Sequence, residues 1–351
     1  MELNRFQLGL FLGLFLGWFQ PDPLLSQTPF YQGKTITVIQ GTSPGGTADM
    51  MVRAALPYLK KHIPGEPTIV SEYMPGAGGV KAANHIYKNV RPDGLTIGNI
   101  GAALVANAVL GEIGVLYDIN KLTYLGSSHS SYHWVFISRR ESGLVNLEAL
   151  RSASGVRVGA QSVGHAVYIV GRLFAFLIGL KEPKFVVGYS GPELDLALPR
   201  GEFDARVTNA DTLLKRNREW LTKGVVEVQA IMEVPKGTKH PYFANLTEIE
   251  DFARSERERK VLAMLRAFRQ VGSPYILPPG TPREQVNILQ EAMVKTFNDP
   301  GFHTEYKKLT GDEPTPLMPQ EMDRAVKELP RDREIVEFFK KISGGGPLPP
   351  R

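Results

Sequence analysis

The sequence contains no cysteine among its 351 residues. This absence excludes a disulfide framework, thiolate metal sites and a cysteine nucleophile. Runs of basic residues interleaved with aromatic residues are also missing, and the formal net charge is only +5. We therefore expect no nucleic-acid partner.

Familiar catalytic signatures are absent as well. The chain has no G-x-S-x-G elbow, no P-loop and no H-E-x-x-H metal motif. His129 and His133 stand four residues apart, a spacing that binds a metal only on a helix, but the surrounding SSHSSYHW is typical of a loop that passes into a strand. We predict a protein that is not an enzyme, with no catalytic residue, no metal site and no cofactor.

Residues 1–30 have the pattern of a signal peptide that is cleaved. A short segment with Arg5 precedes the apolar run Leu8–Phe19, whose 12 residues are fewer than the roughly 20 that a membrane-spanning helix needs. Gln20–Pro23 then breaks the run. Because no cysteine follows, the N-terminus is not lipidated. We expect an exported, periplasmic protein, with an N-terminal hairpin helix or a membrane anchor as the alternatives.

The remaining residues predict an α/β fold. Hydrophobic residues make up 42% and charged residues 22% of the chain, as in a globular protein. After Tyr31, short β-branched runs alternate with helical stretches, which is typical of parallel sheets with helices on their faces. In a first unit we expect strands at Thr35–Gln40, Thr68–Glu72 and Thr96–Ile100, and helices at Ala48–Lys61, with a kink or end at Pro57, and at Val80–Asn89.

A second unit of the same kind occupies the middle of the chain. The strand Trp134–Ile137 leads into it, and the chain returns near the strand Tyr275–Leu277, which the helix Arg283–Phe297 follows. Within it we expect strands at Val156–Gly159, Lys184–Val187 and Ala205–Thr208, and helices at Ala166–Leu180 and around Leu194–Leu198.

Two units in tandem predict two lobes. We assign residues 31–135 and 271–351 to lobe 1 and residues 136–270 to lobe 2. The segment Thr247–Arg269 is expected to form one amphipathic helix with a solvated charged face, and Gly344–Arg351 a frayed tail.

Glycine-rich turns follow the first two strands, at Pro44–Asp49 and Pro75–Gly79, and each opens a helix. Such turns let a ligand approach the backbone, and the unpaired first N–H groups of a helix favour an anion. The alternative for the first turn is a helix cap made by Thr47 or Asp49. The second turn is no dinucleotide fingerprint, because Lys81 stands where the third Gly or Ala is required.

The strands of the second unit end in similar loops. Gly159–His165 follows its first strand, and Gly188–Gly191 and Thr208–Asp211 follow the next two. Ligands of such sheets bind beyond the carboxyl ends of the strands, so these loops would face the first two turns if the lobes close like a clamshell. His165 is either a ligand donor or a capped, solvent-accessible side chain.

Five motifs together carry a resemblance to a known family. From Tyr31 onward, over about 320 residues, the chain resembles the periplasmic substrate-binding receptors of tripartite tricarboxylate transporters, the Bug or TctC family. The motifs are PGGTAD (Pro44–Asp49), MPGAGGVKAAN (Met74–Asn84), RPDG (Arg91–Gly94), YSGPELDLALPRGEFDA (Tyr189–Ala205) and LPPGTPREQVNILQEAM (Leu277–Met293).

The resemblance implies a fold and a binding mode. The fold is a two-lobed, type II-like periplasmic binding protein (Venus flytrap) of the α/β class, each lobe a mostly parallel sheet flanked by helices. The first-lobe loops would hold one ligand carboxylate through backbone N–H groups, and the second-lobe loop the far end. The candidate ligand-binding residues are Thr42, Ser43, Gly45, Gly46, Thr47, Asp49, Ala77, Gly78, Gly79, Gln161, Ser162, Gly164, His165, Tyr189, Thr208 and Asn209.

The sequence departs from the family pattern at contact positions. Thr42 replaces a usual aromatic residue, Tyr73-Met74 a usual Asn-Arg pair, and Thr208-Asn209 a usual Asp-Asn pair. A usually Ser/Thr-rich stretch is His165-Ala166-Val167 here, where the histidine suggests an acidic distal group and the next two residues a hydrophobic body. A dicarboxylate and an aromatic acid both fit.

We therefore expect a monomeric receptor that captures a small organic carboxylate. It would deliver the ligand to the large and small transmembrane permease subunits of a tripartite transporter. The alternatives are a ligand-sensing protein that acts on a membrane sensor kinase and an exported α/β hydrolase.

Overall fold

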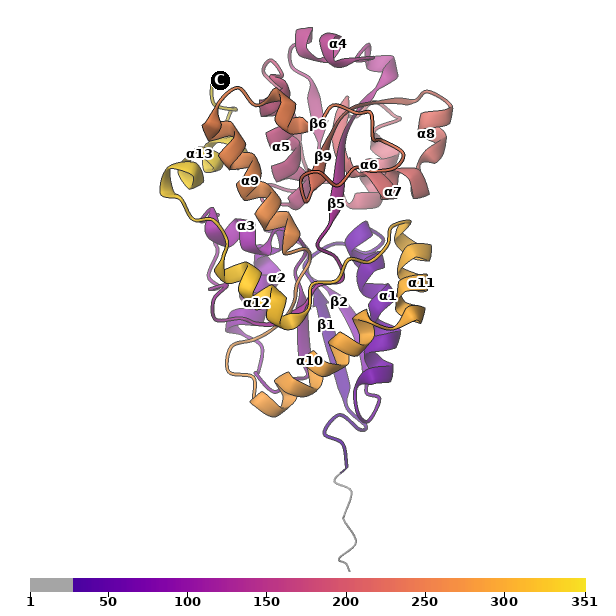
Figure 1. Cartoon of the computed structure of the whole chain (residues 1–351), viewed down its shortest axis with the longest axis vertical. Helices are drawn as coiled ribbons and strands as arrows, with labels where there is room; N and C mark the ends of the chain where they lie inside the picture. Colours follow the sequence, from indigo (N-terminus) through magenta and orange to yellow (C-terminus); the bar gives the residue numbers. More distant parts are fainter. Residues whose placement is uncertain (1–27) are drawn as a thin grey trace, which may run out of the picture.

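The computed structural model describes residues 28–351, and the residues on which the signal-peptide prediction rests lie outside this range. Within it the chain forms two five-stranded sheets, which Figure 1 shows one above the other. No helix of residues 28–351 has the length and apolar character needed to cross a membrane.

The first sheet is built mostly from the N-terminal part of the chain. Its strand order is β2-β1-β3-β10-β4, in which β2, β1 and β3 are parallel and β10 is antiparallel to both of its neighbours. The strand β10 is therefore antiparallel to the other four strands of the sheet. The strands are β1 (Thr35–Gln40), β2 (Thr68–Tyr73), β3 (Thr96–Asn99), β4 (Thr123–Gly126) and β10 (Tyr275–Leu277).

The second sheet repeats this plan. Its order is β7-β6-β8-β5-β9, with β7, β6 and β8 parallel and β5 antiparallel to β8 and β9. In each sheet the antiparallel strand, β10 or β5, is the first strand that the chain forms after it crosses from the other half. The strands are β5 (Tyr132–Arg139), β6 (Arg157–Gly159), β7 (Lys184–Val186), β8 (Ala205–Asn209) and β9 (Val226–Val234). The predicted two-lobed α/β fold with mostly parallel sheets is thus confirmed.

Helices cover the faces of both sheets (Figure 1). Those of the first half are α1 (Thr47–His62), η1 (Ala77–Gly79), α2 (Val80–Lys88), α3 (Leu104–Val109), α10 (Arg283–Phe297), α11 (Pro300–Thr310) and α12 (Pro319–Lys327). Those of the second half are η2 (Arg140–Ser142), α4 (Leu147–Ser152), α5 (Ala166–Ile178), α6 (Gly191–Ala197), α7 (Ala210–Arg216), α8 (Arg218–Thr222), η3 (Ile249–Phe252), α9 (Glu256–Gln270) and α13 (Arg333–Ser343).

The predicted helix Ala48–Lys61 is present as α1, and of the two alternatives at Pro57 the end is excluded, because the helix continues to His62. A second helical expectation needs correction. The segment Thr247–Arg269 is not one helix, because the chain is extended at Ala253 and a new helix, α9, begins after Ser255, whose side chain caps it by accepting from the N–H of Glu258. Three charged side chains of α9 (Glu258, Arg266 and Arg269) are buried, so its charged face is not wholly solvated.

The tail Gly344–Arg351 is not frayed. The Arg351 guanidinium donates to the Glu258 carboxylate and to the carbonyl oxygens of Leu177 and Phe252. The carbonyl of Gly346 accepts from Arg172 on α5. These bonds hold the tail against the helices of the second half.

Two further features bear on the predicted lobe boundaries. The strand β5 belongs as a whole to the second sheet, although residues 132–135 were assigned to lobe 1. The helix α13, also assigned to lobe 1, packs against α5 and α9. The division between lobes stays a prediction, with these two elements on the side of the second sheet.

Candidate functional site

A cavity of about 440 Å³ lies between the two halves, at the carboxyl ends of their parallel strands. This volume is within the range of about 300–1,000 Å³ that is typical of small-molecule sites. Loops after β1, β2 and β3 line it from one half, and loops after β6, β7 and β8 from the other. A ligand there would be in contact with both halves at once.

Most of the predicted ligand-binding residues line this cavity. They are Thr42, Ser43, Gly46, Thr47, Gly78, Gly79, Gln161, Ser162, His165, Tyr189, Thr208 and Asn209. Gly45, Asp49, Ala77 and Gly164 were also predicted, but the structure does not place them in the lining.

Asp49 lies outside the cavity lining and holds the loop after β1 in place. Its buried carboxylate accepts hydrogen bonds from the Gln40 amide, the Gly45 N–H (2.8 Å) and the Tyr73 hydroxyl (2.8 Å). It does not cap α1, since the N-cap residue is Gly46 and no side chain accepts from the first turn. The uncapped N–H groups of a 16-residue helix therefore begin beside the cavity, an arrangement that attracts anions.

His165 faces the cavity and also caps α5. Its Nδ1 atom accepts from the N–H of Val167 at 3.2 Å, which leaves the proton of the neutral ring on Nε2. Burial and, secondarily, the positive charge of Arg269 lower the pKa of His165 to about 4. The side chain is therefore a neutral donor at physiological pH, beside the apolar Ala166 and Val167. The cap that the sequence allowed for is present, and its position in the lining leaves the role of ligand donor a prediction.

Direct contacts between the halves close the cavity. The N–H of Gly78 donates to Ser162 Oγ at 3.1 Å, and the hydroxyls of Thr47 and Thr212 are 3.2 Å apart. Arg216 on α7 donates to the carbonyl of Gly45 at 3.3 Å. All three contacts join the first half to the second half, so the structure is a closed form.

The charged residues in the lining all have polar partners within the protein. Asp195 on α6 accepts from Arg206 at 2.8 Å and contacts Arg216 at 2.9 Å. Glu193 forms a capping box with Ser190 at the start of α6, which lowers the pKa of the Glu193 carboxyl through the hydrogen bonds from Ser190. The paired state of these groups leaves backbone N–H groups and neutral side chains as the donors that face the cavity.

Sequence reasoning missed several lining residues. The loop Ile100–Ala103 follows β3, and the rule on strand ends that selected the first two turns would have found it. Tyr132 and Trp134 line the cavity from β5, with stacked rings 5.5 Å apart. They were missed because this strand was interpreted as a connection between lobes. Ser273, between α9 and β10, was missed for the same reason.

No protein-family model and no curated protein matches the chain. Solved structures do match. The periplasmic binding protein BugD superposes with a TM-score of 0.68 at 18% identity, over 89% of this chain and 98% of BugD. The chain has the fold of periplasmic binding proteins. This confirms, at the level of fold, the resemblance drawn from the sequence.

Two further matching structures are of proteins with a ligand. MatC from Rhodopseudomonas palustris, with bound malate, matches with a TM-score of 0.67 at 20% identity, over 89% of this chain and 99% of MatC. The R. palustris protein Rpa4515, with adipate, matches with a TM-score of 0.66 at 17% identity, over 88% of this chain and 97% of Rpa4515. Both are bound to dicarboxylates.

Proposed function

We propose that this protein is an extracytoplasmic solute-binding receptor that closes its two halves on a small organic carboxylate. It would pass the ligand to the large and small transmembrane subunits of a tripartite tricarboxylate transporter. The protein itself would perform no chemistry, and closure would be a hinge motion about the segments that join the halves.

The observation that carries the proposal is the construction of the cavity. It lies between two sheets, and the loops on both sides expose glycine backbone rather than unpaired acidic side chains. The uncapped start of α1 supplies N–H donors from one side, and the neutral His165 ring supplies one from the other. Such donors suit an anion with two polar ends and an apolar middle, and the dicarboxylates of the two R. palustris proteins are of this kind.

A thermal-shift screen of the chain from Gln27 onward tests the binding role. Ligands to compare are dicarboxylates, tricarboxylates, aromatic acids and amino acids, with the matching amides as neutral controls. A ligand that binds only the folded state at a hundred times its Kd adds about 2.7 kcal/mol of stability. We expect a clear rise in melting temperature with one carboxylate class and none with its amide. The protein is unfolded and refolded beforehand to remove any ligand carried over from purification. If no acid then raises its melting temperature, the carboxylate proposal is contradicted.

Uptake measurements in cells test the transport role. Deletion of the gene should abolish uptake of the acid that the screen identifies, and the full-length chain should restore it. If uptake persists while the transcriptional response to the acid is lost, the receptor serves a sensor kinase instead. Hydrolysis of esters by the pure protein would point to the enzyme alternative.

A further inference from the structure

Two side chains on neighbouring strands of the second sheet line the cavity, and each has a buried donor without a partner. Trp134 on β5 and Asn209 on β8 are both 6% exposed. Among residues 28–351, no group accepts a hydrogen bond from Trp134 Nε1 or from Asn209 Nδ2. Buried donors in folded proteins normally bond to protein or to ordered water. Both atoms therefore need an acceptor that the described chain does not supply.

The register of the sheet places the two side chains next to each other. Trp134 and Asn209 are directly paired across the antiparallel strands β5 and β8. Side chains of such a pair project from the same face of a sheet, with Cβ atoms about 4.5–5.5 Å apart. Tyr132 lies on this face too, since it precedes Trp134 by two residues, but its hydroxyl already contacts Met51 Sδ at 3.5 Å. Trp134 and Asn209 thus offer their free donors side by side.

The start of α7 fixes the orientation of the Asn209 amide. Its Oδ1 atom accepts from the N–H of Thr212 at 2.8 Å and so caps this helix. The NH2 group is then the free end of the amide, and it can only donate. The indole N–H of Trp134 is also only a donor. Two neutral donors of this kind match a solute oxygen rather than a solute N–H group.

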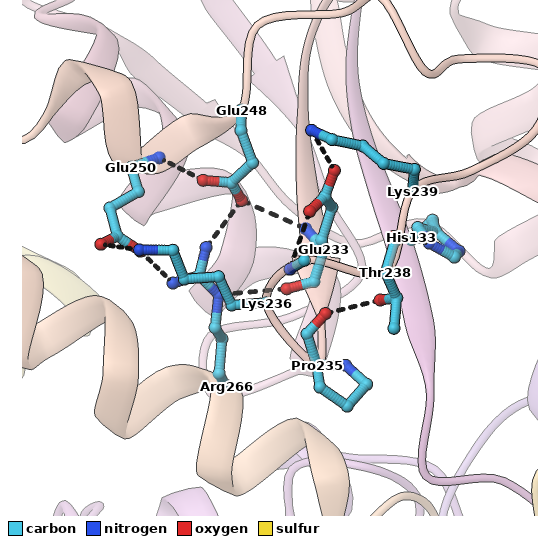
Figure 2. A network of polar contacts seen from close by, with 10 residues as sticks. His133, Glu233, Pro235, Lys236, Thr238, Lys239, Glu248, Glu250 and Arg266 are labelled. Atoms are coloured by element: carbon cyan, nitrogen blue, oxygen red, sulfur yellow. Dashed lines mark hydrogen bonds and ion pairs between the residues drawn. The ribbon is translucent and has the colours of Figure 1, made fainter.

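The opposite face of the same strands has a different character. His133 precedes Trp134 and therefore lies on that face, where its Nε2 atom is 2.7 Å from the Thr238 carbonyl oxygen. Glu233, which is paired with His133 across β5 and β9, contacts Lys239 at 2.9 Å. Figure 2 shows these residues within a network whose charged groups are joined in ion pairs. The two free donors lie on the other face, beside the cavity.

We propose that Trp134 and Asn209 bind an oxygen atom at the far end of the captured solute. This inference rests on the proposed function and names its substrate class, a carboxylate that carries a second oxygen acceptor. The first carboxylate would be held by the uncapped N–H groups of α1, from the first half. The second acceptor is either another carboxylate or an amide carbonyl, because the two donors are neutral and suit both.

Four variants test the protein side of this contact. Trp134→Phe removes the indole N–H and keeps an aromatic ring, and Asn209→Ser removes the NH2 group and keeps a side chain that can cap α7. The matched controls are Trp220→Phe, which changes a 7% exposed tryptophan of α8, and Asn146→Ser, which changes the asparagine that caps α4. Neither control residue lines the cavity.

Matched acids test the solute side, with affinities measured by calorimetry. Adipate and terephthalate are compared with their half-amides and with hexanoate and benzoate, which lack the second acceptor. The wild type should bind at least one diacid about tenfold or more tightly than its monoacid, because buried donors disfavour a solute that leaves them unpaired. A half-amide that binds as well as its diacid shows that a carbonyl oxygen suffices. A half-amide that binds as weakly as the monoacid assigns the contact to a carboxylate.

Loss of a donor should act on the diacid alone. In Trp134→Phe and in Asn209→Ser, affinity for the diacid should fall about tenfold or more, and affinity for the monoacid should change little, since it offers the donors no acceptor. Both controls should bind like the wild type. Fluorescence gives a second measurement, because Trp134 is the one tryptophan that Trp220→Phe leaves in residues 27–351. Its emission should change when the diacid binds.

The failure of this inference and that of the proposed function can be told apart. If a monoacid binds the wild type as tightly as its diacid, or if both donor variants keep wild-type affinity for the diacid, the inference is overturned while the function stands. If none of these acids binds the wild type, the inference fails as well, and the wider acid screen decides on the function. If Trp134→Phe does not fold, wild-type affinity for the diacid in Asn209→Ser would overturn the inference.

Discussion

The backbone N–H of Gly78 donates to the hydroxyl of Ser162 over 3.1 Å, and this bond joins the turn after β2 to the loop after β6 across the cavity. The approach is close enough that a Cβ on Gly78 would lie 2.3 Å from the carbonyl of Gly164. Gly78 also has φ +63°, a conformation that favours glycine. The closed form thus depends on a glycine at this position.

Gly78→Ala should block closure. Because the added methyl group meets backbone of the other half, we expect ligand affinity to fall at least tenfold and the ligand-bound protein to stay more open in small-angle X-ray scattering. Gly33→Ala is the control: Gly33 has a similar φ of +71° but no atom within 4 Å of its Cβ position. Both variants should lose about 1 kcal/mol of stability from backbone strain, and only Gly78→Ala should lose affinity. Equal affinities would show that the halves do not need this contact.

Asp49→Ala should lower stability more than it changes ligand choice. The substitution leaves the donors of Gln40, Gly45 and Tyr73 without their common acceptor. Of these only Gln40 is buried, and a buried donor left unpaired reduces stability by about 1–3 kcal/mol. Urea unfolding and ligand profiles measure the two effects. A changed order of preference among acids, at unchanged stability, would place Asp49 in direct contact with ligand.

Substitutions of His165 should separate its two roles. His165→Ala removes both the cap of α5 and the donor in the cavity, whereas His165→Asn keeps a capping side chain. We expect His165→Ala to lose about 0.5–2 kcal/mol of stability and both variants to bind a different set of acids. Because the pKa of His165 is lowered to about 4, its ring stays neutral between pH 5.5 and 8 and should add no pH dependence to wild-type binding in that range. An unchanged ligand profile in both variants would remove His165 from the site.

The parts of this structure that follow local patterns were predictable from the sequence. The strands β1 and β10 and the helix α10 have the predicted bounds, because each is a short β-branched run or an amphipathic stretch between clear turn residues. The glycine turns led to most of the lining for the same reason, since a strand, a Gly-rich turn and a helix follow each other directly.

Features that depend on tertiary contacts were not predictable. The burial of Arg266 and Arg269 follows from how α9 packs between the halves, which its charged sequence does not indicate. Arg351 is held by groups about 90 to 170 residues away in sequence, so composition alone predicted a frayed tail. The role of Tyr132 and Trp134 follows from the position of β5 in the second sheet, and no local pattern encodes that position.

The stability of the folded protein should fall as pH rises, through the buried carboxyl of Asp312, which lies near Asp211 of the other half. The turn after α11 packs on α7, where a Cβ on Gly311 would lie 3.2 Å from the Asp211 carbonyl oxygen. Burial, and then the charge of Asp211, raise the pKa of the next residue, Asp312, to about 7, although His240, 3.1 Å from Asp211, and the hydrogen bond from the Glu313 N–H act the other way. The charge of Glu313 adds to the rise.

The sign of the pH effect follows from this raised pKa. The unfolded chain loses the Asp312 proton near pH 3.9 and the folded chain only near pH 7, so between these values the folded state binds more protons and its stability falls as pH rises. Above about pH 7 the full loss is present. Asp312→Asn should therefore flatten the decline in melting temperature between pH 5 and 8 and be more stable than the wild type at pH 8. Asp251→Asn, which changes an exposed aspartate, should keep the wild-type slope. Parallel pH profiles for wild type and Asp312→Asn would show that the pKa of Asp312 is not raised in the folded protein.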